Sequence, residues 1–225
     1  MPEVSEDAAR YTLYWTWDSA GMGCHAMLED LGVNYCRQYI EFGAPWPEDY
    51  LVLNPHKKIP TLTDRSSDAG AQKSPVVVYQ SAAILMYLAD NHPDAGLVPA
   101  VGTADRAVCT QWMFFLAEMM MSSYLMYYYP DRHTADVDGA DAVQQKAIDW
   151  IADLWGRLDS QLWDSSFLLG DHISVCDYYM LTFATWNVNG NDFKSLERHS
   201  NVIDWHHGML ERPAVATMLN NHSEH

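Results

Sequence analysis

The chain has 225 residues and a mass of 25.6 kDa, enough for one large domain or two modest ones. Hydrophobic residues make up 48% and charged residues 19%, a globular composition that excludes an intrinsically disordered chain. Lys and Arg number 13 against 30 Asp and Glu, so the formal net charge is -17, which disfavours nucleic acid and anionic membrane surfaces as partners.

Neither a membrane span nor a metal site is indicated by the sequence. No apolar run approaches the roughly 20 residues that cross a bilayer, and the acidic start MPEVSEDAAR lacks the apolar core of a signal peptide. The four cysteines (Cys24, Cys36, Cys109 and Cys176) show no C-x-x-C pair, and the histidines show no metal-binding spacing. We therefore expect a cytoplasmic protein without disulfides or a bound metal.

A β-α-β pattern opens the chain. Residues 11–17 (YTLYWTW) are rich in aromatic and β-branched side chains, which predicts a strand. Ser19 is then placed to cap a helix over residues 22–31, and Gly32 is placed to end it. Residues 34–42 predict a second strand, parallel to the first because a helical crossover separates the two.

A hairpin is predicted after an irregular, proline-bearing stretch over residues 43–55. Residues 59–63 (IPTLT) and 76–79 (VVVY) are strand-like, and the polar segment 65–75 between them can reverse the chain. Pro60 cannot donate a hydrogen bond to a sheet, so it opens the first of these strands.

Helices dominate the rest of the chain. Residues 81–91 have an apolar stripe at helical spacing, and the Pro- and Gly-rich segment 93–104 is the best domain boundary. Beyond it, residues 105–129 form a long Met-rich helical segment that Pro130 ends, and residues 140–162 form a second helix. The two would pack antiparallel in a bundle.

Two further features mark helix starts near the end of the chain. Ser174 and Asp177 have the spacing of a capping box directly after the loop LLGDHI. A later helix spans residues 202–211, and Pro213 opens another helical turn.

Four groups of residues, in this order along the chain, resemble the glutathione S-transferase family. They are Asn54-Pro55 with Ile59-Pro60-Thr61-Leu62, then Tyr79-Gln80-Ser81-Ala82-Ala83-Ile84 with Tyr87-Leu88-Ala89, then Leu169-Gly170-Asp171 with Ile173-Ser174 and Asp177, and finally Trp205 to Val215. The resemblance covers nearly the whole chain from Tyr11. It implies a thioredoxin-like α/β domain at residues 10–92 that binds glutathione. It also implies an all-helical domain at residues 104–225 that carries the hydrophobic pocket for a second substrate.

The Ile59-Pro60 bond is predicted to be cis, because an X-Pro bond that opens a strand at a bend tolerates that isomer. Such a bend turns the backbone N–H and C=O of Ile59 outward, where they can pair with an extended peptide. In the family that peptide is the cysteinyl unit of glutathione. The alternative is that Pro60 only shapes a turn.

Other glutathione-binding residues are implied by the same resemblance. Gln80 and Ser81 stand at a helix start, where a carboxylate is favoured, and resemble the residues that accept the γ-glutamyl end. Glutamate is commoner at the Gln80 position, and Ser81 has the alternative role of a plain helix cap. Lys57 and Lys58 could meet the glycyl carboxylate or form a solvated surface pair, and His56 lies in the same loop.

Conjugation requires a glutathione thiolate, and a hydroxyl at the start of the first helix can stabilise that anion. Ser19 is the first candidate for this hydroxyl, and Tyr14 and Thr16 are alternatives. A further alternative is that no residue of the chain activates the thiol. Ala20 stands where the beta-class pattern has its catalytic cysteine, which argues against a mixed-disulfide mechanism.

An apolar second substrate is expected from the Met- and Tyr-rich segment of the helical half. The candidate pocket residues are Met119, Met120, Tyr124 and Tyr127. Consecutive residues cannot all face one way on a helix, so part of this run belongs to the core or to a dimer interface.

The sequence therefore predicts a cytoplasmic, homodimeric glutathione transferase of the detoxification type, with glutathione as co-substrate and a small apolar electrophile as acceptor. One alternative is a non-catalytic relative that carries ligands or binds proteins, since a fold does not fix a function. Another is a glutathione-dependent lyase, isomerase or dehalogenase. A lyase, isomerase or dehalogenase would differ from a transferase only in the pocket for the second substrate.

Overall fold

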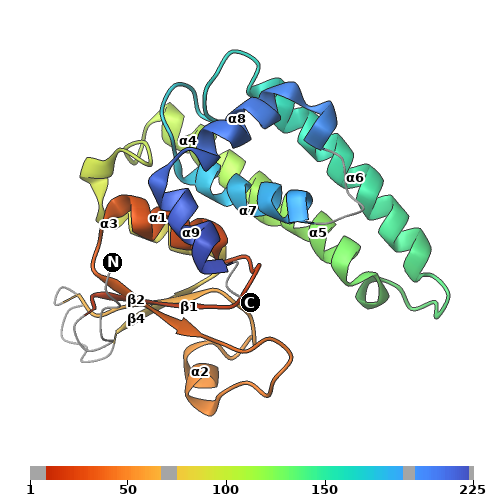
Figure 1. Ribbon diagram of the computed structural model, residues 1–225, viewed down its shortest axis with the longest axis horizontal. Coiled ribbons are helices and arrows are strands. Elements are labelled where there is room, and N and C mark those ends of the chain that lie inside the picture. Colours follow the sequence, from red (N-terminus) through yellow and green to blue (C-terminus); the bar gives the residue numbers. More distant parts are fainter. Residues whose placement is uncertain (1–8, 67–74, 190–195, 223–225) are drawn as a thin grey trace. The chain divides into compact units, whose positions relative to one another are not determined.

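A computed structural model describes residues 9–66, 75–189 and 196–222 (Figure 1). Contacts divide the chain into two compact units. The first unit consists of Met1–Ala95 together with Arg212–His225, and the second is Gly96–Glu211.

The first unit is built on a mixed sheet in the strand order β2-β1-β3-β4. Its described elements are β1 (Tyr11–Trp15), α1 (Met22–Leu31), β2 (Tyr35–Tyr39), α2 (Glu48–Leu53), β3 (Thr61–Asp64), β4 (Val76–Tyr79), α3 (Ser81–Asn91) and α9 (Pro213–His222). As predicted, β2 pairs parallel to β1, with Tyr11 opposite Tyr35. β3 pairs antiparallel with both β1 and β4, which confirms the predicted hairpin strands. Residues 67–74 of the predicted reversal lie outside the described residues.

Local signals fix several boundaries of these elements. Gly32 ends α1 with a φ of 61°, a left-handed conformation that glycine adopts without steric cost. α3 has the predicted bounds. β1 ends at Trp15, two residues before the predicted end.

Helix α2 corrects the prediction of an irregular stretch over residues 43–55. Pro47 precedes it with a φ of -58°, an angle compatible with helix entry, and Glu48 and Asp49 place negative charge in its first turn. Only six residues long, the helix shows too little periodicity to be recognised from the sequence.

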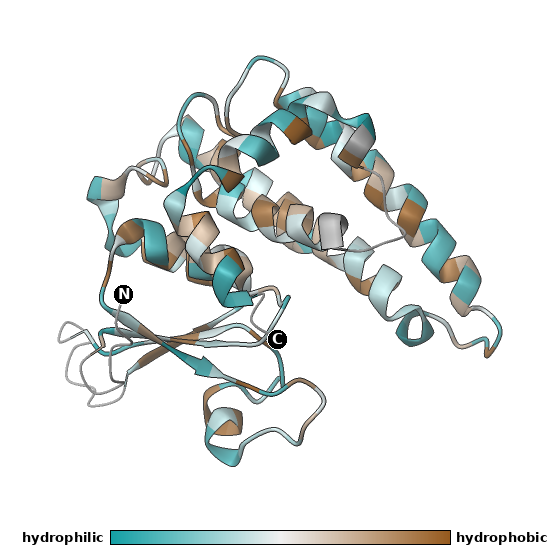
Figure 2. Ribbon diagram, viewed as in Figure 1, coloured by the Kyte–Doolittle hydropathy of each residue, from teal (hydrophilic) through white to brown (hydrophobic). Residues whose placement is uncertain are grey.

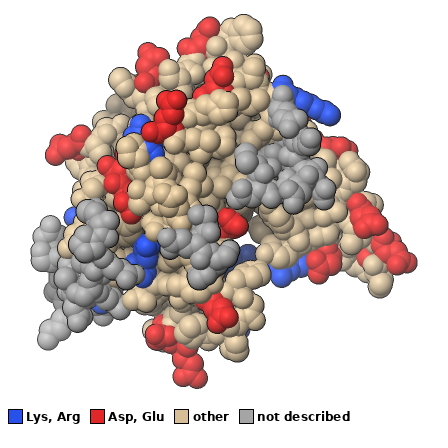
Figure 3. All heavy atoms as spheres, viewed as in Figure 1, with Lys and Arg blue, Asp and Glu red and all other residues tan. Residues whose placement is uncertain are grey.

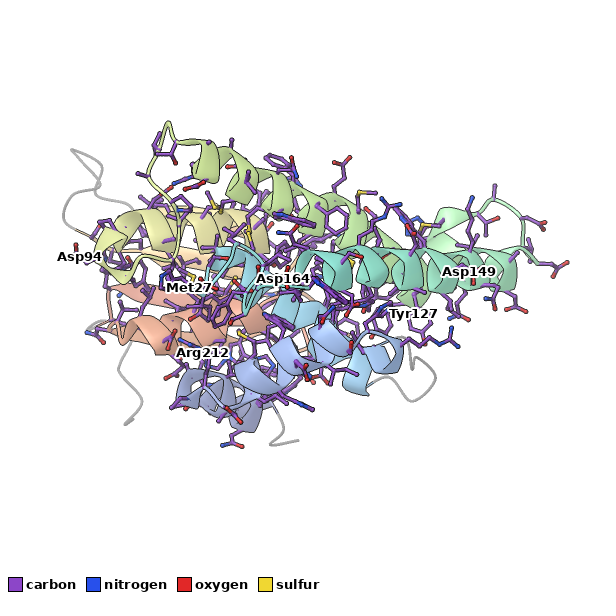
Figure 4. All side chains as sticks on the ribbon, turned by 90° about the horizontal axis from the view of Figure 1, so that it is seen from above. Met27, Asp94, Tyr127, Asp149, Asp164 and Arg212 are labelled. Atoms are coloured by element: carbon purple, nitrogen blue, oxygen red, sulfur yellow. The ribbon has the colours of Figure 1, made fainter. Side chains whose placement is uncertain are left out.

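Helices lie on both faces of the sheet in the first unit. α1, α3 and α9 lie on one face and α2 on the other (Figure 1). Leu13 and Leu62 from the sheet, Met27 from α1 and Ile84 from α3 are fully buried in this unit. Figure 4 shows Met27 and Arg212 among the side chains of α1 and α9, where Arg212 forms an ion pair with Asp30.

The C-terminal helix belongs to the first unit. The sequence-based division placed residues 104–225 in one helical domain, whereas in the structure α9 packs against α1. The buried residues of α9 that accompany this packing include Val215, Met218 and His222.

The second unit is helical. Its main elements are α4 (Ala104–Phe114), a π-helical segment (Phe115–Met120), α5 (Met121–Tyr128), α6 (Ala140–Gln161), α7 (Val175–Asn189) and α8 (Ser200–Leu210). α6 packs against α5, and Tyr127 and Asp149 mark the two helices in Figure 4. Brown and teal residues alternate along α6 in Figure 2, as expected for a helix with one buried stripe.

One half of the predicted capping box at the start of α7 forms, because the Asp177 side chain accepts from the Ser174 N–H, while the Asp177 N–H donates to the Ser174 backbone carbonyl instead of its hydroxyl. The Asp177 carboxylate accepts hydrogen bonds from the Ser174 N–H (2.8 Å) and the Ser174 hydroxyl (2.7 Å). It also accepts from the Leu168 N–H and the Trp205 indole N–H, so this buried charge is fully hydrogen-bonded. Asp177 therefore stabilises the second unit.

The surface reflects the acidic composition. The face shown in Figure 3 carries many more acidic side chains, in red, than basic ones, in blue. Among the described residues, no helix is both long and apolar enough to traverse a bilayer.

Candidate functional site

Three segments of the first unit meet at one edge of the sheet, the edge formed by the ends of its strands and not by an outer strand. They are the turn after β1 (residues 16–21), the bend before β3 (residues 54–60) and the junction between β4 and α3 (Gln80 and Ser81). Because β1 and β4 both run antiparallel to β3, the ends of β1 and β4 lie at the same edge as the start of β3. The topology thus brings together the residues predicted to activate and bind the tripeptide.

The bend before β3 contains the predicted cis bond, between Ile59 and Pro60. Ile59 is half-buried and Pro60 is buried. The carbonyl oxygen of Lys58, one residue earlier, accepts hydrogen bonds from the Tyr50 hydroxyl and from the Asn54 side-chain amide. Sequence reasoning did not assign a role to Tyr50 or Asn54.

The turn after β1 packs directly on this bend. A Cβ added to Gly21 would lie 3.3 Å from the Pro60 Cβ and 3.3 Å from the Ser19 Oγ. These distances leave little room for a side chain at position 21, so the backbone of the turn approaches the proline ring closely. Ser19 and Pro60 are therefore neighbours in the structure.

Ser19 does not cap α1, which corrects the prediction. The helix begins at Met22 with Gly21 as its N-cap, and the Ser19 Oγ accepts a hydrogen bond from the Gly21 N–H at 3.3 Å. Asp18 adopts a φ of 44° and thereby adds a turn between β1 and the helix. Because Ser19 only accepts in this contact, its hydroxyl proton can be donated to another group.

Tyr14 and Thr16, the alternative hydroxyls, alternate along the chain with Leu13 and Trp15. The Tyr14 ring lies 5.4 Å from the Tyr50 ring, which places Tyr14 on the face covered by α2. Thr16 is only 5% exposed, and within the described residues its hydroxyl has no hydrogen-bond partner.

The start of α3 connects two of the three segments. The Ser81 hydroxyl donates a hydrogen bond to the Ala20 carbonyl at 2.7 Å, so this proton links α3 to the turn after β1. The first N–H groups of a helix have no partner within it, and the helix dipole adds positive potential there. The start of α3 can therefore receive a carboxylate through backbone groups even though the Ser81 hydroxyl is engaged.

Backbone strain is concentrated in the same place. Among the described residues, those other than glycine with a positive φ are Asp18 (44°), Lys57 (55°) and Gln80 (77°). Asp18 lies in the turn after β1, Lys57 in the bend before β3, and Gln80 at the junction between β4 and α3. Such conformations are costly and cluster at functional sites in proteins generally.

The loop residues His56, Lys57 and Lys58 are exposed at this edge. The His56 ring contacts the Tyr79 ring at a centroid distance of 5.2 Å, which holds the loop against the end of β4. Lys57 and Lys58 bring positive charge into a chain that is otherwise strongly acidic.

The thiols nearest the site are buried. Cys24 on α1 is fully buried and its thiol donates to the Ser81 carbonyl at 3.7 Å. Burial raises the pKa of Cys24, so the reactive thiolate form is disfavoured. In the part of the chain that the structure describes, no cluster of three or more His, Cys, Asp or Glu side chains could hold a metal ion.

The candidate pocket residues of the second unit differ in exposure. Met119 is 36% exposed and Tyr127 is half-buried. Met120 and Tyr124 are buried, and the Tyr124 hydroxyl donates to the Phe183 carbonyl while accepting from the Trp155 indole N–H. Met120 and Tyr124 are thus packed in the core of this unit, as expected for part of the run, whereas Met119 and Tyr127 reach its surface.

Residues 21–91 match a family model described as glutathione S-transferase, N-terminal domain. The GST-like protein YncG of Escherichia coli is 27% identical over 135 residues, or 60% of each chain, so the chain spans less than two thirds of that relative. The disulfide-bond oxidoreductase YfcG of Escherichia coli is 26% identical over 216 residues, 92% of this chain and 93% of that one.

Among solved structures, the glutathione transferase URE2P6 from Phanerochaete chrysosporium, in complex with oxidized glutathione, is similar with a TM-score of 0.81. The identity is 24%, and the match covers 98% of this chain and 99% of that chain. This likeness confirms the predicted fold, a thioredoxin-like α/β part combined with an all-helical part.

Proposed function

Because the chain belongs to the glutathione S-transferase family, we propose that it is a glutathione transferase. It binds glutathione at the sheet edge formed by the three segments and activates the thiol for attack on an apolar electrophile. The observation that carries this proposal is the meeting of the cis Ile59-Pro60 bend, the start of α3 and the Ser19 turn at one edge.

Each part of the tripeptide has a complementary group at this edge. The cysteinyl backbone pairs with the N–H and C=O of Ile59 as a short added strand. The γ-glutamyl end meets Gln80, Ser81 and the free N–H groups at the start of α3. The glycyl carboxylate meets Lys57 and Lys58, with His56 beside them.

Ser19 stabilises the thiolate in this proposal. A free thiol has a pKa of about 8.5, so at neutral pH most of it is protonated and unreactive. A hydroxyl that donates to the sulfur, together with the positive end of α1, favours the anion. The contact between Gly21 and Pro60 supports Ser19, because it brings the Ser19 turn onto the bend. Thr16, in the same turn, is only 5% exposed, and the Tyr14 ring packs against Tyr50.

The acceptor is a small apolar electrophile, consistent with the exposed Met119 and half-buried Tyr127 of the second unit. The protein works as a homodimer in the cytoplasm, in a detoxifying role.

Isothermal titration with glutathione and a turnover assay with an aryl chloride test this function. The Ser19→Ala variant is expected to bind glutathione within about threefold of the wild type but to turn over about 10- to 100-fold more slowly, because it loses a hydrogen bond to a charged group. Tyr14→Phe and Thr16→Val are the matched controls. Equal turnover in wild type and Ser19→Ala would remove Ser19 from the mechanism.

The non-catalytic alternative is favoured by Gln80, whose neutral amide cannot form an ion pair with the ammonium group of the tripeptide. Glutathione binding without turnover of any electrophile would support that alternative. A small disulfide belongs among the tested substrates, because the similar YfcG is named a disulfide-bond oxidoreductase.

A further inference from the structure

The carbonyl oxygen of Lys58 lies inside a closed network of buried side chains. Its two donors, Tyr50 on α2 and Asn54 directly after that helix, are 1% and 0% exposed. The Asn54 amide nitrogen is 2.9 Å from this oxygen. Because both donors are shielded from water, their hydrogen bonds hold the Lys58 carbonyl in one direction.

The same two side chains also hold the other end of the bend. The Thr61 hydroxyl oxygen lies 2.8 Å from the Tyr50 hydroxyl and 3.0 Å from the Asn54 amide nitrogen. Thr61 is fully buried at the first position of β3. Residues 58 and 61, which flank the cis bond, are therefore fixed by one pair of side chains.

Every proton in this network has an acceptor. The Asn54 amide uses one N–H for the Lys58 carbonyl and the other for Thr61, the Tyr50 hydroxyl donates to the Lys58 carbonyl, and the Thr61 hydroxyl donates to Tyr50. The Asn54 side-chain oxygen Oδ1 in turn accepts from the His56 N–H at 3.1 Å. Burial raises the pKa of Tyr50, which keeps its phenol protonated and able to donate.

This arrangement fixes the direction of the Ile59 N–H. The Lys58 carbonyl and the Ile59 N–H belong to one planar peptide unit, and it is trans, since the cis bond found among the described residues is Ile59-Pro60. In a trans unit the C=O and the N–H point in opposite directions. With the carbonyl directed toward Tyr50 and Asn54, the N–H points away from them, and within the described structure it donates to no protein acceptor.

We propose that Tyr50 and Asn54 are positioning residues that aim the Ile59 N–H at the peptide backbone of bound glutathione. The proposal rests on the proposed function, because that function supplies the ligand. Neither side chain needs to touch the tripeptide, since both act through the Lys58 peptide unit. Without them the unit can rotate, and the N–H is correctly aimed for only part of the time.

Tyr50→Phe tests this role with the smallest change, because the ring that stacks on Trp46 at 5.5 Å is retained and only the hydroxyl is lost. The matched control is Tyr35→Phe, which removes a tyrosine hydroxyl that donates to Glu29 elsewhere in the same unit. We expect Tyr50→Phe to raise the Kd and the KM for glutathione about three- to tenfold, the range of one net hydrogen bond. The kcat at saturating glutathione and the Kd of Tyr35→Phe should stay within about twofold of the wild type.

The NMR signal of the Ile59 amide, measured without ligand, gives a readout that does not depend on activity. We expect a shifted Ile59 resonance and increased backbone motion by ¹⁵N relaxation in Tyr50→Phe, and an unchanged resonance in Tyr35→Phe. If Tyr50→Phe does not fold, Thr61→Val removes one member of the network and should act in the same direction.

The outcomes separate the two proposals. A wild-type chain that does not bind glutathione overturns the proposed function, while the Ile59 resonance and its relaxation still show whether the network orients the Ile59 unit. A wild-type chain that binds, with the same Kd and the same Ile59 resonance and relaxation in Tyr50→Phe, overturns the positioning role.

Discussion

His222, at the end of α9, should make the stability of the first unit dependent on pH. Its ring lies 4.6 Å from the Trp15 ring and 5.5 Å from the His25 ring, measured between centroids, and the residue is 7% exposed. Within the described residues neither of its ring nitrogens has a hydrogen-bond partner. Burial, with smaller contributions from His25 and Arg37, lowers the pKa of His222 to about 3 from an ordinary value of 6.5.

The sign of the effect follows from where the proton binds. Below pH 6.5 the unfolded chain takes up a proton on His222 that the folded unit cannot accommodate, so acid favours unfolding. The contribution of neutral His222 to the free energy of unfolding is fully present above pH 6.5 and is lost as the pH falls toward 3. One proton is worth about 1.4 kcal/mol per pH unit, so the free energy of unfolding drops by about 2 kcal/mol between pH 7 and pH 5. His25, whose pKa burial also lowers, adds in the same direction.

Hydrogen exchange of peptides from β1 and α9, corrected for intrinsic rates, measures the free energy of opening at each pH. We expect the wild type to lose about 2 kcal/mol or more between pH 7 and pH 5, and His222→Phe to lose about 2 kcal/mol less over that interval. His172→Phe, at an exposed histidine in the second unit, should keep the wild-type slope. If His222→Phe and the wild type lose the same free energy over this interval, His222 is not the source of the pH dependence.

Three more substitutions have defined expected outcomes. Asp177→Ala leaves four hydrogen-bond donors without an acceptor and should lower the unfolding free energy of the second unit by about 3 kcal/mol or more. Substitution of the exposed Asp171 by Ala should change that free energy by under about 0.5 kcal/mol. Urea denaturation measures both variants, and equal effects would contradict the stabilising role of Asp177. Cys24→Ala should leave turnover within about twofold, because a buried protonated thiol is unreactive; a loss above about tenfold in the turnover assay would place the thiol in the reaction. Gly21→Val should cost about 1 to 3 kcal/mol and weaken glutathione binding, since its Cβ would crowd Pro60; calorimetry that finds the wild-type Kd would show that the turn can move away.

Elements with local signals could be predicted from the sequence. β1 follows from its aromatic and β-branched residues, β2 from its imperfect alternation after a helical crossover, and Gly32 ends α1 because it tolerates a left-handed φ. The start of α7 follows from the spacing of Ser174 and Asp177. Helix α2 was missed because it is short and its entry is flanked by prolines, which indicate a loop when seen alone.

Features of the site that depend on distant contacts could not be predicted. The cis bond was accessible because Ile59-Pro60 is one local step at the start of a strand. The Ser81 hydroxyl, by contrast, donates to a carbonyl 61 residues away, and a serine at a helix start equally indicates a cap. The Tyr50 and Asn54 hydrogen bonds are likewise set by how the bend folds back on α2.

In the Met-rich segment, which side chains are buried could not be predicted from regular helical spacing. A π-helical segment over Phe115–Met120 interrupts the helix between α4 and α5. Its hydrogen bonds span five residues instead of four, so the residues after it face a side that regular helical spacing does not predict. The sequence indicates by residue type that this segment is apolar, but the π-helical turn prevents regular spacing from showing which members, such as Tyr124, lie in the core.

A crystal structure of the chain with bound glutathione would show where the tripeptide lies. We predict one tripeptide per chain, paired with the backbone of Ile59, with its γ-glutamyl end at the start of α3 and its sulfur within about 3 to 3.5 Å of the Ser19 hydroxyl. A tripeptide bound away from the bend, or a sulfur in contact with Tyr14 or Thr16 instead, would contradict this prediction.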